Sequence, residues 1–310
     1  MSSTGFRHEA LLYAGEDEFV DGCASFVRCG LEQGEPTLVV VGRRKLDALR
    51  EALGADAAGV SFADMADVGR NPARIIPAWQ EFVLRCGRPG VGLRGIGEPI
   101  FPERGVDELV ECERHEALLN LAFAGADSFW LVCPYDVDAL APAVIGEARR
   151  NHPLVTSGGH CHDSADYRGL EDVAAPFAEP LREPPACAAA LDLADTPLEL
   201  VRRFVSDEAE RLGLDRRRSL EFVVAVNELA ASSPRDGAGR RSLRIWGEGS
   251  KVVCELRDRS RLDDPLADRV LPRRGDPTAR ALWLANQLCD LVQVRTAGDE
   301  LIVRLHAART

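Results

Sequence analysis

The sequence predicts an α/β protein of two domains, which we separate near residue 185. Up to about residue 155, apolar β runs alternate with amphipathic helices, a pattern typical of a mostly parallel sheet with helices on both faces. A proline-rich stretch at 176–190 then disfavours helix and predicts an extended connector. After it, two helices precede two hairpins with a further helix between them, which predicts a two-layer α/β sandwich.

The elements of the first domain follow from the spacing of apolar residues. The run 36–42 is continuously apolar, as in a strand covered on both faces, and 18–34 repeats its apolar residues at helical spacing up to Gly34. We expect a kink at Pro77 in the helix that contains it. The predicted strands are 8–14, 36–42, 60–65, 90–101 and 128–136, and the predicted helices are 18–34, 44–53, 71–87, 107–123 and 139–153.

The second domain begins with a helix-start signal. Thr196 can cap the helix, Pro197 suits its first turn, and Glu199 completes a T-x-x-E capping box. The predicted helices are 197–212, 215–233 and 278–291, and the predicted hairpins are 242–258 and 292–306, with a charged, proline-containing stretch at 259–277.

Composition narrows the class of protein. The chain has 310 residues and a formal net charge of −12, which argues against a nucleic-acid binder. No stretch approaches the ~18 apolar residues of a membrane span, and the first residues lack the pattern of a secretory signal. The nine cysteines are odd in number and contain no CxxC pair, which favours a reducing, cytoplasmic compartment over a disulfide framework.

Three segments of the second domain, at 221–233, 254–269 and 278–295, resemble the GHKL-type ATPases, specifically the RsbW-like anti-sigma factors and serine kinases. The resemblance covers about 190–310. It implies the GHKL two-layer fold, a sigma factor or its antagonist as the partner, and a possible homodimer.

The resemblance also implies where a nucleotide site would lie. In this family, an E-x-x-x-N box holds Mg²⁺-ATP; Glu228 matches its Glu, but Ser232 stands at the Asn position. One helical turn separates the two, so they share a face. The adenine-binding Asp is matched by Asp258, whereas Ser260 replaces the following Gly. A strand-end turn is the alternative role of Asp258.

The phosphate-binding G-x-G-L motif of the family is replaced in this sequence by Ala279, Arg280, Ala281 and a leucine. Where the backbone needs a positive φ, each alanine costs about 1 kcal/mol or more. Arg280 keeps a positive group there, and the lid adds Arg273 and Arg274, although such a run of charge more often marks a solvated surface. We therefore predict a degenerate ATP site, with no cofactor; ATP and Mg²⁺ belong to the alternative of an active kinase with Glu228 as its catalytic residue.

In the first domain, the segments 8–19, 31–42, 93–101 and 111–123 resemble the MEDS sensory domain, and the resemblance covers about 5–155. It implies a RecA-like fold without a Walker A loop. The sequence agrees, because it contains no GxxxxGK[ST] motif. The predicted boundaries are 1–180 for the MEDS-like domain with its tail, 181–192 for the proline-rich linker and 193–310 for the GHKL-like domain.

Open α/β sheets bind ligands at the carboxyl ends of their strands. On this rule the candidate sensor-site residues are His8, Tyr13, Arg94, Glu98 and His115. Each has a structural alternative: His115 suits a helix surface or a satisfied core position, and the glycines of 90–97 suit tight turns.

The segment 158–167 contains four residue types that can bind metals: His160, Cys161, His162 and Asp163. A structural zinc needs four ligands, and no second cluster stands at a usable spacing. We therefore expect a polar loop here and no metal.

The predicted function is a cytoplasmic transcription regulator of anti-sigma type, in which a sensor domain controls a protein-binding GHKL domain. The alternative is an active serine/threonine kinase of a partner-switching system. A histidine kinase ranks lowest, because no histidine lies between His162 and His306 to accept a phosphoryl group.

Overall fold

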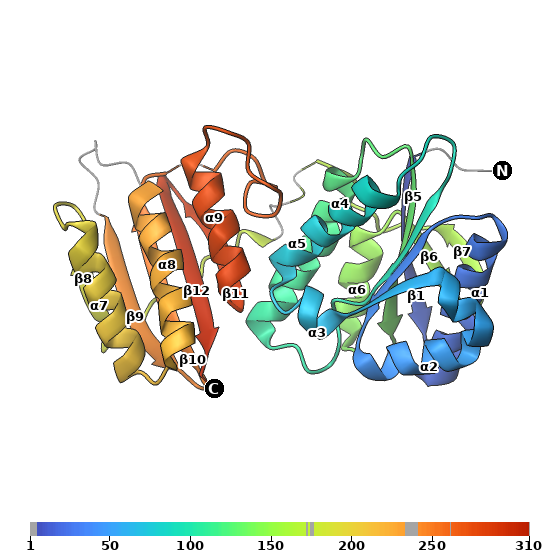
Figure 1. Ribbon diagram of the computed structural model, residues 1–310, viewed down its shortest axis with the longest axis horizontal. Helices are drawn as coiled ribbons and strands as arrows, with labels where there is room; N and C mark the ends of the chain where they lie inside the picture. The colour runs from blue at the N-terminus through green and yellow to red at the C-terminus, as the bar shows by residue number, and fades with distance from the viewer. Residues whose placement is uncertain (1–4, 172, 174–176, 233–240, 261, 310) are drawn as a thin grey trace. The chain divides into compact units, whose positions relative to one another are not determined.

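The computed structural model describes residues 5–171, 173, 177–232, 241–260 and 262–309. The chain divides into two compact units, Met1–Phe177 and Ala178–Thr310 (Figure 1). Each contains its own sheet, so the prediction of a mostly parallel sheet and a separate antiparallel sheet is confirmed. Among the described residues, no helix combines the length and apolarity needed to cross a bilayer.

A seven-stranded sheet in the order β3-β2-β4-β5-β1-β6-β7 forms the centre of the first domain (Figure 1). The strands pair in parallel except for the antiparallel β6–β7 pair. Every residue of β2 is buried, in agreement with its apolar sequence. The strands are β1 (Gly5–Tyr13), β2 (Thr37–Val41), β3 (Val60–Asp64), β4 (Leu93–Gly97), β5 (Ser128–Asp136), β6 (Leu154–Ser157) and β7 (His160–Asp163).

Helices cover both faces of this sheet. On one face, Phe19 and Val27 of α1 and Leu46 of α2 form one buried apolar cluster with Val39 and Val41 of β2. The opposite face of β1 meets α5, whose Glu116 and Asn120 contact His8. The helices are α1 (Gly15–Glu32), α2 (Arg43–Leu53), α3 (Met65–Val68), α4 (Ile75–Cys86), α5 (Val106–Ala122) and α6 (Pro142–Asn151).

Two expectations for the first domain are wrong. The segment 158–167 is not simply a polar loop, because His160–Asp163 form β7, a fully exposed edge strand. The helix containing Pro77 is not kinked in its middle. It begins at Ile75, so Pro77 lies in the first turn, where no intrahelical partner for its missing N–H is needed.

The glycines of β4 lie in the strand itself and not in tight turns. A Cβ on Gly97 would lie 2.9 Å from Cζ2 of Trp79, and one on Gly95 would lie 3.0 Å from Cζ3 of the same ring. Trp79 of α4 is 1% exposed. The two glycines therefore let a large indole pack directly on the strand.

We expect Gly97→Val to lower the free energy of unfolding of the first domain by about 1–3 kcal/mol, because the new side chain overlaps Trp79. Gly125→Val is the control: a Cβ at Gly125 has no atom within 4 Å, and that substitution is expected to change stability by less than about 0.5 kcal/mol. Urea unfolding followed by tryptophan fluorescence measures both. Equal effects of the two substitutions would contradict the packing argument.

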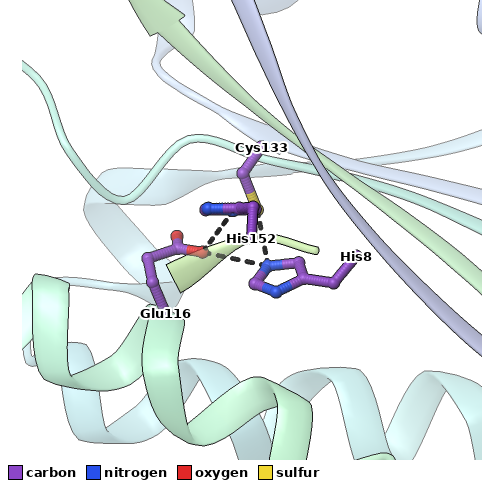
Figure 2. A group of neighbouring side chains, drawn as sticks. All are labelled: His8, Glu116, Cys133 and His152. Atoms are coloured by element: carbon purple, nitrogen blue, oxygen red, sulfur yellow. Dashed lines mark hydrogen bonds and ion pairs between the residues drawn. The ribbon is translucent and has the colours of Figure 1, made fainter. Parts of the chain in front are cut away.

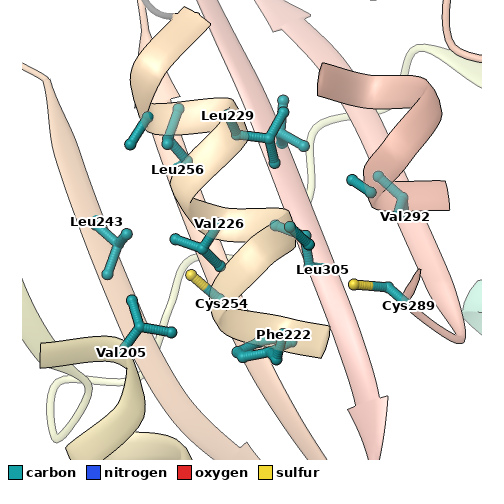
Figure 3. Close-up of a cluster of buried hydrophobic side chains, with 14 of the residues drawn as sticks. Val205, Phe222, Val226, Leu229, Leu243, Cys254, Leu256, Cys289, Val292 and Leu305 are labelled. Atoms are coloured by element: carbon teal, nitrogen blue, oxygen red, sulfur yellow. The ribbon is translucent and has the colours of Figure 1, made fainter. Parts of the chain in front are cut away.

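The second domain contains a five-stranded antiparallel sheet in the order β11-β12-β10-β9-β8, with helices on one face (Figure 1). Figure 3 shows its core, where Phe222 and Leu229 of α8 pack against Cys254 and Leu256 of β10 and Leu305 of β12. The elements are β8 (Ala189–Asp192), α7 (Leu198–Arg211), α8 (Arg216–Ser232), β9 (Ser242–Glu248), β10 (Lys251–Asp258), α9 (Pro277–Leu288), β11 (Leu291–Ala297) and β12 (Glu300–Ala308).

The proline-rich connector is bound to the sheet of the second domain. Its last part forms the edge strand β8, which pairs with β9. Before that, the carbonyl of Glu179 accepts a hydrogen bond from Arg295 (3.3 Å), and the carbonyl of Arg182 accepts one from Arg304. Strand β10 alternates between the apolar face under the helices and a polar face that carries Glu255 and Arg257. The connector thus contributes to the domain as part of its structure.

Acid is expected to lower the free energy of unfolding of the second domain, because His306 binds a proton more readily in the unfolded chain than in the folded one. His306 is 2% exposed, and Nε2 lies 3.0 Å from Oε1 of Gln293. Burial, together with the charges of Lys251 and Arg304, lowers the pKa of His306 to about 3. Because the unfolded histidine binds its proton near pH 6.5, the stability that neutral His306 contributes is complete above that pH and is lost as the pH falls.

From pH 6.5 to 5, this histidine accounts for a loss of about 2 kcal/mol. His306→Gln is expected to remove that part of the pH dependence, since glutamine does not titrate. Urea unfolding at the two pH values measures the difference. An unchanged slope in the variant would contradict the assignment.

Candidate functional site

The carboxyl ends of β1, β3, β4 and β5 of the first domain surround a pocket of about 490 Å³. Tyr13 ends β1, Asp64 ends β3, Asp136 ends β5, and Glu98 directly follows β4. This is the edge at which open α/β sheets bind ligands. Further lining residues include Lys45 at the start of α2 and the apolar side chains of Met65, Phe101 and Pro102.

Tyr13, Lys45 and Glu98 form the polar centre of this pocket. The Tyr13 hydroxyl donates to Oε1 of Glu98 at 2.9 Å, and the Lys45 ammonium donates to the Tyr13 oxygen at 2.5 Å and to the same carboxylate. Glu98 is only 4% exposed, and burial raises its pKa despite the neighbouring ammonium. Burial, reinforced by the charge of Glu98, raises the pKa of Tyr13 as well. The pocket therefore offers hydroxyl, ammonium and carboxyl groups beside an apolar surface.

The charge of the pocket disfavours anions. Its lining contains five acidic and three basic side chains, and Arg43 and Arg44 are already paired with Asp64 (3.2 Å) and Glu16 (2.6 Å). The first turn of α1 is acidic, and Glu18 accepts a hydrogen bond from the backbone N–H of Ala14 at 2.8 Å. A helix N-terminus occupied by carboxylates does not favour phosphate.

Only Tyr13 and Glu98, of the five predicted sensor-site residues, meet at this edge. Arg94 lies near the start of β4, where its Nε donates to Glu35 at 2.5 Å and its guanidinium stacks 4.6 Å from the centre of the Phe26 ring. His115 is buried in α5 and does not line the pocket. The structure therefore does not bring the five candidate residues together at one site.

His8 belongs to a separate, fully buried cluster with Glu116, Cys133 and His152 (Figure 2). Its Nε2 lies 3.1 Å from Oε2 of Glu116 and 3.4 Å from Sγ of Cys133. Nε2 of His152 lies 3.2 Å from the same carboxylate oxygen. The sequence analysis missed the three partners of His8, because they come from α5, β5 and the residue after α6, which share no local motif.

The candidate nucleotide residues of the second domain lie on three elements. Glu228 and Ser232 share one face of α8, but the Ser232 hydroxyl donates to the carbonyl of Leu229 at 3.0 Å. Asp258, at the end of β10, is 3% exposed and accepts a hydrogen bond from the N–H of buried Ser260 at 2.7 Å. This contact is the strand-end turn that was the alternative role of Asp258.

The start of α9 is capped by the chain itself. Asp276 accepts a hydrogen bond from the N–H of Ala279 at 2.9 Å. Ala279 and Ala281 are buried, Arg280 is exposed, and all three lie within the helix, so neither alanine has the positive φ considered above. Arg273 and Arg274 are exposed. A carboxylate thus occupies the helix N-terminus where the resemblance would place phosphates.

Comparison with known proteins bears on the first domain. Residues 7–153 match the family model MEDS, described as MEthanogen/methylotroph, DcmR Sensory domain. A search of curated proteins found no match. The MEDS match ends before the second domain and agrees with the resemblance expected over 5–155. The first domain is thus similar to the MEDS sensory domain, which indicates a signalling or regulatory role for this chain.

Proposed function

We propose that this chain is a cytoplasmic transcription regulator of anti-sigma type, in which the MEDS-like domain senses a small molecule and the GHKL-like second domain binds a protein. The partner is a sigma factor, its antagonist, or both, and the chain can form a homodimer. The proposal that the first domain senses a small molecule rests on the pocket around Tyr13, Lys45 and Glu98, which lies within the segment similar to a sensory domain.

The pocket chemistry favours an uncharged ligand with a hydrogen-bonding group. The excess of carboxylates disfavours anions, while Met65, Phe101 and Pro102 offer apolar contact. A thermal-shift screen of the full chain with small alcohols, ketones and amides, and with phosphate and ATP as anionic comparisons, tests this. We expect uncharged compounds to raise the melting temperature.

Glu98→Gln is expected to abolish that shift, whereas Glu32→Gln, an exposed position at the end of α1, keeps it. A screen in which only anions stabilise the chain would contradict the proposed ligand class. A shift that persists in Glu98→Gln would contradict the site.

The protein-binding half rests on the altered nucleotide residues. Ser232 donates to its own helix, Asp258 caps a turn, and Asp276 occupies the start of α9. A kinase needs these groups, or their family equivalents, to position metal and phosphates. We therefore favour protein binding without phosphoryl transfer, and the active kinase remains the alternative because Glu228 is present.

Two measurements distinguish these functions. In isothermal titration of the full chain with ATP and Mg²⁺, we expect no micromolar binding; such binding, lost in Glu228→Ala, would support the kinase. In a bacterial two-hybrid assay against the sigma factors of the host and their antagonists, we expect at least one interaction. Failure with every one of these proteins would count against the anti-sigma assignment.

A further inference from the structure

Four metal-binding side chains converge at one buried point of the first domain. His8 comes from β1, Glu116 from α5, Cys133 from β5, and His152 follows α6 (Figure 2). One ligand atom from each lies within 4.8 Å of all the others, and all four side chains are buried. The register of β1 with β5 explains why His8 and Cys133 lie close together. Ala10, two residues after His8 on the same face of β1, pairs with Cys133.

The neighbouring groups orient both imidazoles. Nδ1 of His152 lies 2.8 Å from the carbonyl of Ala148, which can only accept a hydrogen bond, so this nitrogen donates. Nδ1 of His8 lies 3.1 Å from Oδ1 of Asn120, whose Nδ2 donates to the carbonyl of Asn151 at 2.8 Å. The network therefore assigns a proton to Nδ1 of each histidine, and a neutral ring then has its lone pair on Nε2. Metal-binding histidines commonly show this arrangement.

Neutral histidines leave the centre of the cluster short of positive charge. Both Nε2 lone pairs face Oε2 of Glu116 at 3.1 and 3.2 Å. Among the described residues, Nε2 of His152 and Oε1 of Glu116 have no hydrogen-bond partner. A buried carboxylate facing lone pairs is costly unless a cation lies between them.

We propose that His8, Glu116, Cys133 and His152 bind one divalent cation of the zinc class. The Nε2 atoms, one carboxylate oxygen and the Cys133 sulfur are the four ligands. Oε2 of Glu116 lies 3.1 Å from Nε2 of His8 and 3.2 Å from Nε2 of His152, and Sγ of Cys133 lies 3.4 Å from Nε2 of His8. These separations are close to the distance of about 3.3 Å between two ligand atoms of a tetrahedral site with ~2.0 Å bonds. Imidazole, carboxylate and thiolate together suit zinc and neighbouring transition metals.

Charge balance supports a divalent ion. On binding, the Cys133 thiol loses its proton to solvent, and the carboxylate of Glu116 is already ionised; two negative ligands and the doubly charged cation then sum to zero. Because the thiolate and not the thiol binds metals, the cation must displace the proton of Cys133. We therefore expect binding to weaken as the pH falls.

The test uses the full chain without a histidine tag, produced in medium containing cobalt or zinc. We expect one metal per chain by mass spectrometry of the elements, and cobalt protein with a thiolate-to-cobalt charge-transfer band and strong tetrahedral d–d bands. Cys133→Ser is expected to abolish the charge-transfer band and to weaken binding by about tenfold or more.

Two matched variants should keep the band. Cys112→Ser changes another buried thiol of the same domain, and Cys161→Ser changes the exposed strand that also contains His160 and His162. Loss of the band in Cys161→Ser but not in Cys133→Ser would place the metal on the exposed strand and overturn the proposal. Absence of metal from the wild-type chain would overturn it as well.

A measurement on the wild-type chain covers the case in which Cys133→Ser does not fold. X-ray absorption at the zinc edge is expected to show one sulfur and three nitrogen or oxygen neighbours. A shell without sulfur, or with several sulfurs, contradicts this ligand set.

Discussion

Glu255→Ala is expected to lower the free energy of unfolding of the second domain by about 3–5 kcal/mol, because it leaves buried positive charge without its partner. Glu255 is 1% exposed, and both of its oxygens are engaged. Oε2 accepts from Nε of Arg304 at 3.0 Å, and Oε1 accepts from Nε of Arg257 at 2.7 Å. Arg304 is itself only 6% exposed, so water cannot readily replace the lost carboxylate.

Glu183→Ala is the matched control for Glu255→Ala. Glu183 also contacts Arg257, at 3.1 Å, but its side chain is 73% exposed, so its loss should cost no more than about 1 kcal/mol. Calorimetric unfolding of the two variants gives the comparison. If both substitutions have the same small effect, the prediction that loss of the buried Glu255–Arg304 ion pair strongly destabilises the domain is wrong.

Phe222→Ala is expected to cost about 3–5 kcal/mol, since it opens a cavity in the middle of the second core. The ring of Phe222 is 1% exposed and lies between α8 and the sheet (Figure 3). Urea unfolding measures the change in free energy.

Leu220→Ala, two residues earlier on the same helix, changes a side chain that is 59% exposed, and we expect an effect within about 0.5 kcal/mol. A large effect at Leu220 would show that this face of α8 is covered, for example by a partner or a second copy of the chain.

Long apolar or amphipathic segments were predictable from the sequence, and short edge strands were not. The run 36–42 and the helix at 18–34 contain enough apolar positions to define both element and buried face. Strands β7 and β8 have four residues each, and β7 is wholly exposed. Their backbone pairs with a neighbouring strand, but none of their side chains is fully buried.

The sequence also left open which candidate site residues lie close together in space. Arg94 and Glu98 were expected together, yet four residues of extended strand separate them by about 13 Å, which places them at opposite ends of β4. Tyr13 and Glu98 do lie together, because β1 ends at Tyr13 and β4 ends directly before Glu98 at the same edge of the sheet. Cys133 and His152 lie far from His8 along the chain. The register of β1 with β5 brings Cys133 to His8, and the return of the chain after α6 brings His152.

The hydrogen bonds of the connector restrict where the second domain can be cut. A fragment beginning at residue 190 would lack the carbonyls of Glu179 and Arg182, and would leave Arg295 and Arg304 without acceptors that they have in the whole chain. The same bonds give the connector a mechanical role. Any pull on the chain at residues 179–182 must either break them or drag side chains anchored in β11 and β12, so force arriving from upstream is delivered directly to the sheet.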